Sequence, residues 1–137
     1  MSRAKNLANF QTTITDGTTS VATSTAIDRV KNGAAKSWVN FNGSTVTNAS
    51  DLTGVDQSFN ISSVVDNNTG RYTPSQTNSF ANANYVITHG ALYAAGNGWF
   101  HSYFNKTTAN VEFLFISTLG SYTDSTDVSI IYTGDLA

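Results

Sequence analysis

Short runs in which apolar and polar residues alternate occur through most of the chain, and this period of two is typical of β-strands. In residues 57–65, for example, Phe59 and Ile61 alternate with serine and asparagine, so one strand face is apolar and the other is hydroxyl-rich. Turn-forming residues such as Asn42-Gly43 separate the runs. Strands are expected at residues 36–41, 45–47, 57–65, 71–73, 83–91, 98–105, 110–117 and 128–132.

Short strands at this spacing, without a convincing helix of ten residues, predict an all-β fold with an antiparallel β-sandwich or jelly-roll-like body. In 36–41, two of the three apolar side chains Trp38, Val39 and Phe41 are expected in the core, and the third is expected to meet a neighbour. In 110–117 and 128–132 both alternating sets are largely apolar, which suits central strands covered on both faces. A small domain often obtains one such cover from a partner subunit, so this pattern points to an oligomer.

Residues 1–35 differ from the rest, because they are rich in threonine and serine and poor in apolar side chains. Asp16-Gly17 marks a turn, with a possible hairpin between residues 12–15 and 18–23. We interpret this segment as an arm that becomes ordered against a neighbouring subunit or a larger particle. The alternatives are a flexible tail or two edge strands of the same domain. The predicted organisation is therefore an extended N-terminal arm, 1–35, and a sandwich body, 36–137.

The composition is that of a folded protein with a neutral polar surface. Charged residues make up 12% of the chain and the net charge is −2, while Thr, Ser and Asn number 20, 16 and 15. Aromatic residues at 12% argue against disorder. The scattered cations make nucleic acid a poor partner. No apolar run has the length of a membrane span, and the N-terminus lacks a secretory signal, so synthesis in a cytosol without membrane insertion is expected.

Residues that could carry catalysis or bind a cofactor are few. The chain has two histidines, His89 and His101, and no cysteine, and no acidic residue stands at a spacing that would complete a metal site. It contains no Gly-x-Ser-x-Gly elbow and no phosphate-binding glycine loop. Glu112, the chain's glutamate, falls in the most apolar expected strand, where a glycosidase acid would be out of place. We therefore predict no enzyme activity, no cofactor and no metal.

One local cluster suggests binding. Trp99, His101 and Tyr103 alternate within an expected strand and should share one face, with Asn97 nearby. Aromatic faces combined with polar tips are what a sugar-binding surface uses. These four residues are thus candidate receptor or glycan contacts. The competing interpretation is that the same side chains belong to the core.

Three phrases of the chain, AKSWVNFNG, QSFNISSVVDNNTGRYT and NANYVI, occur in this order between residues 35 and 87. Together they resemble a bacteriophage virion domain that occurs at the ends of tail fibres and in short virion appendage proteins. The resemblance covers a little over a third of the chain. The chain departs from the family pattern after Gly70, where Tyr72-Thr73-Pro74 stands in place of an alternating strand. Because proline has no N–H to donate to a strand ladder, we expect an edge or a loop there.

The resemblance implies a non-enzymatic structural part of a virion, made in the bacterial cytoplasm and assembled into the particle. It implies a homotrimeric tail fibre or tail tip protein that contributes to attachment to the host, with receptor contact through loops of the C-terminal body. The aromatic cluster described above makes a bacterial surface glycan a possible ligand. The N-terminal arm would serve either docking or trimerisation, and docking to other virion proteins would use Arg3, Leu7, Phe10 and Ile14. A capsid decoration (cement) or head-fibre protein is the alternative, because fold does not determine the place on the particle.

Overall fold

The computed structural model describes residues 13–15, 20–22, 34–92, 99–118 and 120–137, in two compact units, Met1–Ala34 and Ala35–Ala137. In the first unit, strands β1 (Thr13–Thr15) and β2 (Ser20–Ala22) pair in antiparallel fashion, with Ile14 opposite Val21, as the sequence suggested. The predicted arm contacts Arg3, Leu7 and Phe10 lie outside the described residues.

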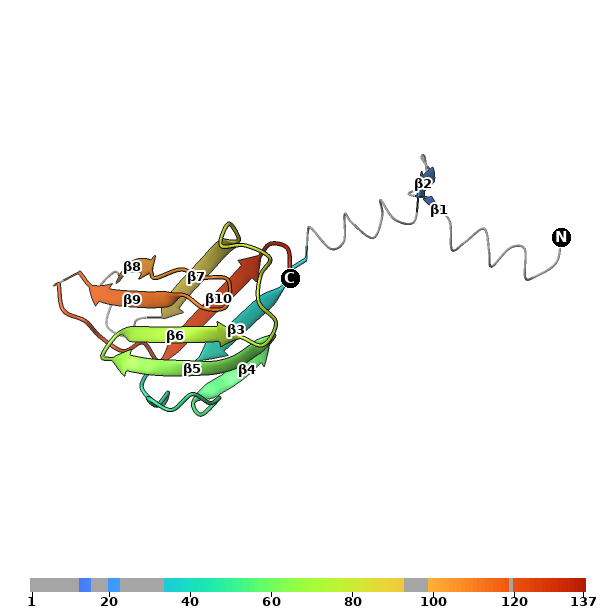
Figure 1. Ribbon diagram of the computed structural model, residues 1–137. Coiled ribbons are helices and arrows are strands. Elements are labelled where there is room, and N and C mark those ends of the chain that lie inside the picture. The colour runs from blue at the N-terminus through green and yellow to red at the C-terminus, as the bar shows by residue number, and fades with distance from the viewer. Residues whose placement is uncertain (1–12, 16–19, 23–33, 93–98, 119) are drawn as a thin grey trace. The chain divides into compact units, whose positions relative to one another are not determined.

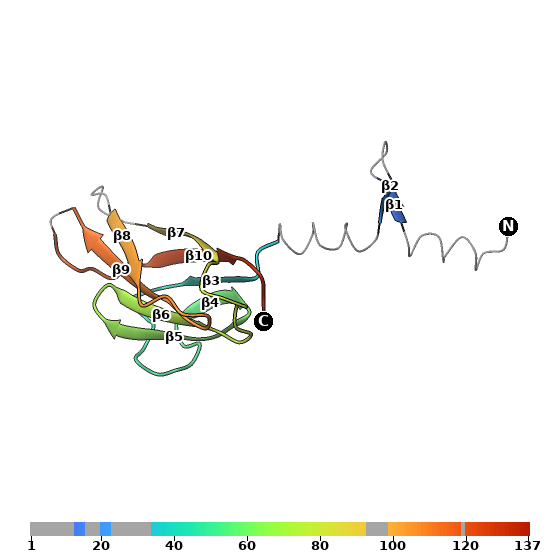
Figure 2. The same ribbon diagram turned by 45° about the horizontal axis from the view of Figure 1, so that its top comes forward.

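The second unit is an all-β body of two four-stranded antiparallel sheets that face each other, which confirms the predicted β-sandwich (Figures 1 and 2). The strands are β3 (Ser37–Phe41), β4 (Val55–Phe59), β5 (Ile61–Asn68), β6 (Arg71–Gln76), β7 (Val86–Leu92), β8 (Trp99–Phe104), β9 (Glu112–Ser117) and β10 (Asp127–Thr133). One sheet, here called the β3–β10 sheet, has the order β4-β3-β10-β7. The other, the β6–β9 sheet, has the order β5-β6-β9-β8.

The core between the sheets is largely aromatic. Phe41 of β3 lies edge-on to Tyr72 of β6, with ring centroids 5.1 Å apart, and Tyr72 lies 5.9 Å from Phe115 of β9. Tyr132 of β10 lies 6.3 Å from Phe113 of β9. Each ring comes from an alternating run whose other members point outward, so the period-two pattern built this core. Burial of these large side chains is the main force that holds the sheets together.

Asn60 divides residues 57–65, which we expected to form one strand, into two strands of different sheets. Its φ of 56° is left-handed, a conformation that asparagine tolerates better than most residues, and it turns the chain from β4 into β5. The side-chain amide of Asn60 stabilises this corner. Its Nδ2 donates to the backbone carbonyls of Lys36 and Asn78, each at 3.1 Å, and its Oδ1 accepts from the backbone N–H of Asn78 at 2.8 Å. Asn60 therefore joins β3, the β4–β5 corner and the end of β6.

Pro74 lies inside β6, so the expectation of an edge or loop at this point was wrong. The strand runs between β5 and β9, and Pro74 pairs with Val64. The Val64 N–H donates to the Asp51 carbonyl, away from β6, so this pair exchanges no ladder hydrogen bonds and the ring nitrogen of Pro74 faces β9. There the β6–β9 ladder stops after Tyr72. The missing N–H is therefore not needed.

The expected strand at 45–47 is also absent; these residues form a turn that follows β3. The N–H groups of Thr45 and Val46 both donate to the Asn42 carbonyl, at 3.0 and 3.1 Å. The side chain of Val46 is buried in the hydrophobic core. A β-branched composition favoured a strand, but local hydrogen bonding to Asn42 determines the conformation.

The Asn60 corner can be tested by two substitutions. Asn60→Ala removes the amide hydrogen bonds and places alanine, which tolerates positive φ less well than asparagine, at this position. We therefore expect a loss of about 2–4 kcal/mol in unfolding free energy. Asn60→Gly keeps the backbone conformation and should lose about 1–2 kcal/mol less. Urea denaturation measures both. The matched control is Asn105→Ala, at another positive-φ position with one side-chain bond of 3.3 Å; equal losses at both sites would contradict the role of the corner.

Candidate functional site

Two members of the predicted glycan cluster, His101 and Tyr103, lie on the inner side of β8. His101 and Tyr103 share one face, since they pair with Phe115 and Phe113, which are buried residues of β9. Asn97 and the side chain of Trp99 lie outside what the structure describes.

His101 is directed between the sheets and lies 5.0 Å, ring to ring, from Phe115. Tyr103 stands at the rim with 44% of its surface exposed. The alternation predicted the shared face, but only the pairing with β9 reveals that this face turns toward the core. Receptor contact by this cluster stays a prediction.

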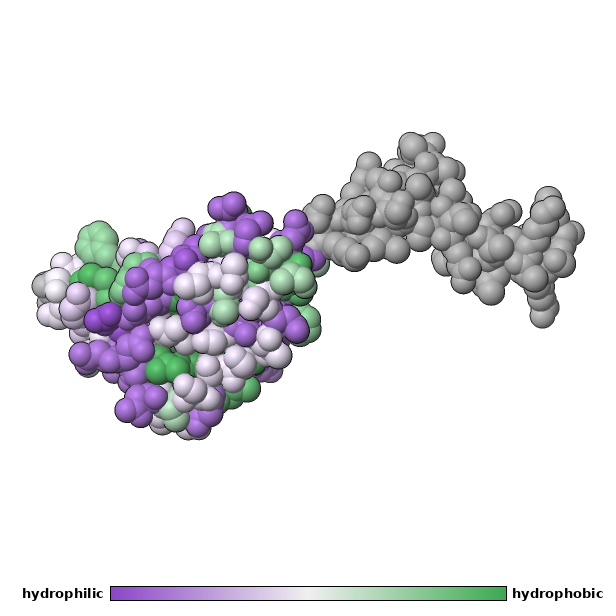
Figure 3. All heavy atoms as spheres, viewed as in Figure 1, coloured by the Kyte–Doolittle hydropathy of each residue, from purple (hydrophilic) through white to green (hydrophobic). Residues whose placement is uncertain are grey.

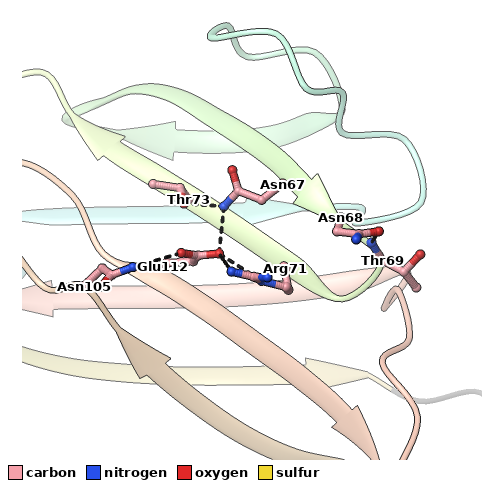
Figure 4. A network of polar contacts seen from close by, with 7 residues as sticks. All are labelled: Asn67, Asn68, Thr69, Arg71, Thr73, Asn105 and Glu112. Carbon is pink, nitrogen blue, oxygen red and sulfur yellow. Dashed lines mark hydrogen bonds and ion pairs between the residues drawn. The ribbon is translucent and has the colours of Figure 1, made fainter.

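A polar network around Glu112 covers the outer face of the β6–β9 sheet (Figure 4). Oε1 of Glu112 accepts hydrogen bonds from Arg71 Nε at 3.0 Å and Nη2 at 2.6 Å, and from Asn67 Nδ2 at 3.1 Å. Oε2 accepts from Asn105 Nδ2 at 3.3 Å, and Asn67 also donates to Thr73 Oγ1 at 2.7 Å. The Arg71 guanidinium lies over the ring of Phe104, 5.4 Å from its centroid.

This network connects all four strands of the sheet, because its members come from β5, β6, β9 and the residue that follows β8. Both oxygens of the Glu112 carboxylate are engaged by donors, which suits a structural role better than proton transfer. The sequence placed Glu112 in an apolar strand but gave no sign of the partners, because they meet only after four strands align.

A second exposed surface lies on the outer face of the β3–β10 sheet, where one row of side chains is apolar. Strand register places Phe59 beside Trp38 and Trp38 beside Ile131. Phe59 is 55% exposed and Ile131 45%, while Trp38 is partly exposed. As expected, two of the three apolar side chains of 36–41 are in the core; the structure shows that these are Val39 and Phe41 and that Trp38 is partly exposed. The described residues do not cover the outer face of β10, which the sequence suggested would be covered.

The next row across the same sheet is polar. Gln57 pairs with Asn40 and Asn40 with Ser129. Nδ2 of Asn40 donates to Asp127 Oδ1 at 2.7 Å and to Ser129 Oγ at 2.9 Å, which orients all three groups. We name the two rows together the aromatic–amide face. Its members are Phe59, Trp38, Ile131, Gln57, Asn40, Ser129 and Asp127.

A shallow hollow of about 250 Å³ adjoins the polar row, between Gly90 and Leu92 of β7 and Asp127 and Ser129 of β10. Gly90 pairs with Ser129, and a Cβ added to it would meet no atom within 4 Å, so open space lies above the backbone. In the view of Figure 3 the hydrophobic residues of the body form separate patches among hydrophilic ones.

The described residues contain no group of three or more histidine, cysteine or acidic side chains that could hold a metal ion. Over the same residues, no helix has the length and apolar character needed to cross a membrane. Comparisons of the chain with protein-family models, with curated proteins and with solved structures gave no match. The geometry of the aromatic–amide face is therefore the main guide to binding. Sequence reasoning missed this face because its residues come from three separate strands, β3, β4 and β10.

The structural role of Glu112 gives a stability prediction. Glu112→Ala leaves Arg71 and two asparagines without their shared acceptor, so we expect a loss of about 1–3 kcal/mol in unfolding free energy. Glu112→Gln keeps an acceptor oxygen but not the charge and should lose about half as much. Thermal and urea unfolding measure the change. Wild-type stability in Glu112→Ala would contradict the bracing role.

Proposed function

We propose that this protein is a non-enzymatic structural component of a bacteriophage virion, a homotrimeric tail fibre or tail tip protein that helps to attach the particle to its host. The resemblance of three phrases between residues 35 and 87 to phage appendage domains supports the proposal. So does the division of the chain into a small N-terminal unit and a sandwich body. In this proposal the N-terminal unit holds other virion proteins and the body faces the host.

The observation that carries the binding role is the pairing of an apolar aromatic row with a polar row on one exposed sheet face. Trp38 and Phe59 offer flat apolar surface for the faces of sugar rings. Asn40, Ser129 and Gln57 offer neutral donors and acceptors for hydroxyl groups at the neighbouring positions. With one carboxylate, Asp127, in this set, a neutral bacterial surface glycan is the ligand class that fits best.

A capsid decoration or head-fibre protein is the second candidate, and the same two-unit organisation favours it. A small N-terminal unit joined to a compact body suits a protein anchored at one end to a capsid lattice. The two candidates differ in where the protein lies on the particle and in whether adsorption depends on the body.

Immunogold labelling of intact virions with an antibody against residues 36–137 distinguishes them. We expect label confined to the tail or its tip. Label spread over the head would replace the fibre proposal with the decoration proposal. Absence of label from purified particles that contain the full set of other virion proteins would contradict both.

Filling the hollow tests the binding face. Gly90→Val adds a side chain where nothing lies within 4 Å, and it suits a strand, so unfolding free energy should stay equal or rise by up to about 1 kcal/mol. Binding to immobilised bacterial surface glycans should weaken at least about tenfold, because the added methyl groups occupy the hollow.

The matched control is Ser102→Val, at an exposed position of β8 in the other sheet, and it should leave binding unchanged. Surface plasmon resonance against a glycan panel provides the measurement. Equal binding by Gly90→Val and wild type would exclude the hollow. Release of reducing sugar from a bound glycan would contradict the non-enzymatic role.

A further inference from the structure

The two histidines of the chain face each other across the interior of the sandwich, at its β7–β8 side. His89 belongs to β7, the edge of the β3–β10 sheet, and His101 belongs to β8, the edge of the β6–β9 sheet. Their ring centroids are 5.3 Å apart, with an angle of 36° between the planes. Their strands pair with β10 and β9 but not with each other, so side chains join the sheets here.

The groups that face this pair are mostly uncharged rings. His89 lies edge-on to Phe113 and Phe115 of β9, at 5.3 and 6.4 Å, and to Tyr103 of β8, at 6.4 Å. Its cross-strand neighbour on β10 is Ile130. Among the residues that the structure describes, the other titratable groups on this side are Tyr132, which lies 6.3 Å from Phe113, Tyr85, and Lys106. The Nζ of Lys106 lies 4.3 Å from the centroid of the Tyr85 ring and 6.0 Å from that of the Tyr103 ring.

These surroundings favour neutral imidazoles. Burial lowers the pKa of His89, and the neighbouring His101 lowers it further; burial also lowers the pKa of His101. Nδ1 of His89 is buried without a hydrogen-bond partner among the described residues. Lys106 on the same side is itself a cation, so it cannot offset the positive charge of a protonated His89 or His101.

We propose that His89 and His101 form an acid-sensitive seam, which closes the β7–β8 side of the sandwich at neutral pH and opens it when both imidazoles take up protons. Two positive charges whose ring centres are 5.3 Å apart repel each other, and solvation by water favours their separation. Opening would expose the inner faces of β8 and β9, with Tyr103, Phe113 and Phe115. This inference is independent of the glycan proposal.

The β7–β8 side is also the part of the body best suited to open. Among the described residues, β7 and β8 make no backbone–backbone hydrogen bonds outside their ladders, and the Leu92 carbonyl at the end of β7 accepts one side-chain bond, from Ser125 Oγ at 2.7 Å. On the edge strand β5, by contrast, the N–H groups of Val64 and Asp66 donate to the carbonyls of Asp51 and Thr47. Neither β7 nor β8 contains Lys, Arg, Asp or Glu, the residues that commonly protect an exposed strand edge. The seam is therefore the main barrier to separation here.

The direction of the pH effect follows from linkage. A histidine whose pKa is lower in the folded than in the unfolded chain contributes stability that is lost as pH falls below about 6.5. Asp66, whose pKa is raised by burial and by Asp124, contributes the opposite slope at lower pH. Comparing wild type with histidine variants separates the contribution of the two histidines to the pH dependence from that of Asp66, which is present in both.

Amide hydrogen exchange of the full chain between pH 7.5 and 5.0, corrected for the intrinsic pH dependence, tests the proposal. An opening that takes up one proton becomes up to about tenfold more favourable per pH unit, and one that takes up two becomes up to about 100-fold more favourable. We expect the β7 and β8 amides to lose at least about tenfold in protection while Val39 in β3 does not. An equal loss of amide protection in all strands, or no loss in any strand, would contradict the proposed seam.

Two variants add an independent check. His101→Phe and His89→Gln each remove one titrating ring, and either should reduce the pH dependence in β7 and β8; one folded variant is sufficient. Titration of the wild-type imidazoles by NMR should show a pKa below about 6.5 for both. Ordinary pKa values for both rings, or unchanged pH dependence in a folded variant, would also overturn the proposal.

Discussion

The body depends on one backbone constraint, the left-handed turn at Asn60 that carries the chain from one sheet into the other. The apolar alternation runs on through this residue, so without the turn β4 and β5 would form one long strand. The positive φ breaks that continuity, and the amide of Asn60 secures the beginning of β3 and the end of β6 to the same corner. The inner rings of both sheets, among them Phe41 and Tyr72, can then meet in one core.

The outer faces follow from the same arrangement. Once Val39, Phe41 and the alternate residues of β10 are committed to the core, Trp38, Asn40, Ser129 and Ile131 must point outward. The β-strand period thus places aromatic and amide side chains in adjacent rows without any loop. On the other sheet, outward positions hold the Glu112 network, which satisfies its own polar groups. In our proposal the first face presents groups to a ligand, while the network on the second stabilises strand pairing.

The sequence was sufficient for the fold class, because alternating runs with turn residues between them are a local signal. It also predicted that two of the three apolar side chains of 36–41 are core, but it left open which two, and it expected a cover over the outer face of 128–132 that the described residues do not provide. It failed at two residues where strand membership depends on hydrogen bonds to distant segments. Asn60 bonds to Lys36 and Asn78, and opposite Pro74 the Val64 N–H donates to Asp51.

The candidate surfaces were harder to foresee than the fold. His101 and Tyr103 were correctly placed on one face, but whether that face turns inward depends on the pairing of β8 with β9. The aromatic–amide face joins residues from β3, β4 and β10, whose adjacency no spacing in the sequence reveals.

The central functional proposal is that the aromatic–amide face contacts a glycan. The most direct measurement is a series of ¹⁵N–¹H correlation spectra of the labelled chain during titration with polysaccharide purified from the host surface. We predict saturable shifts at Asn40, Gly90 and Ile131, with little change at Ser102 and Tyr103. Shifts confined to β8, or no saturable shifts at all, would contradict the claim.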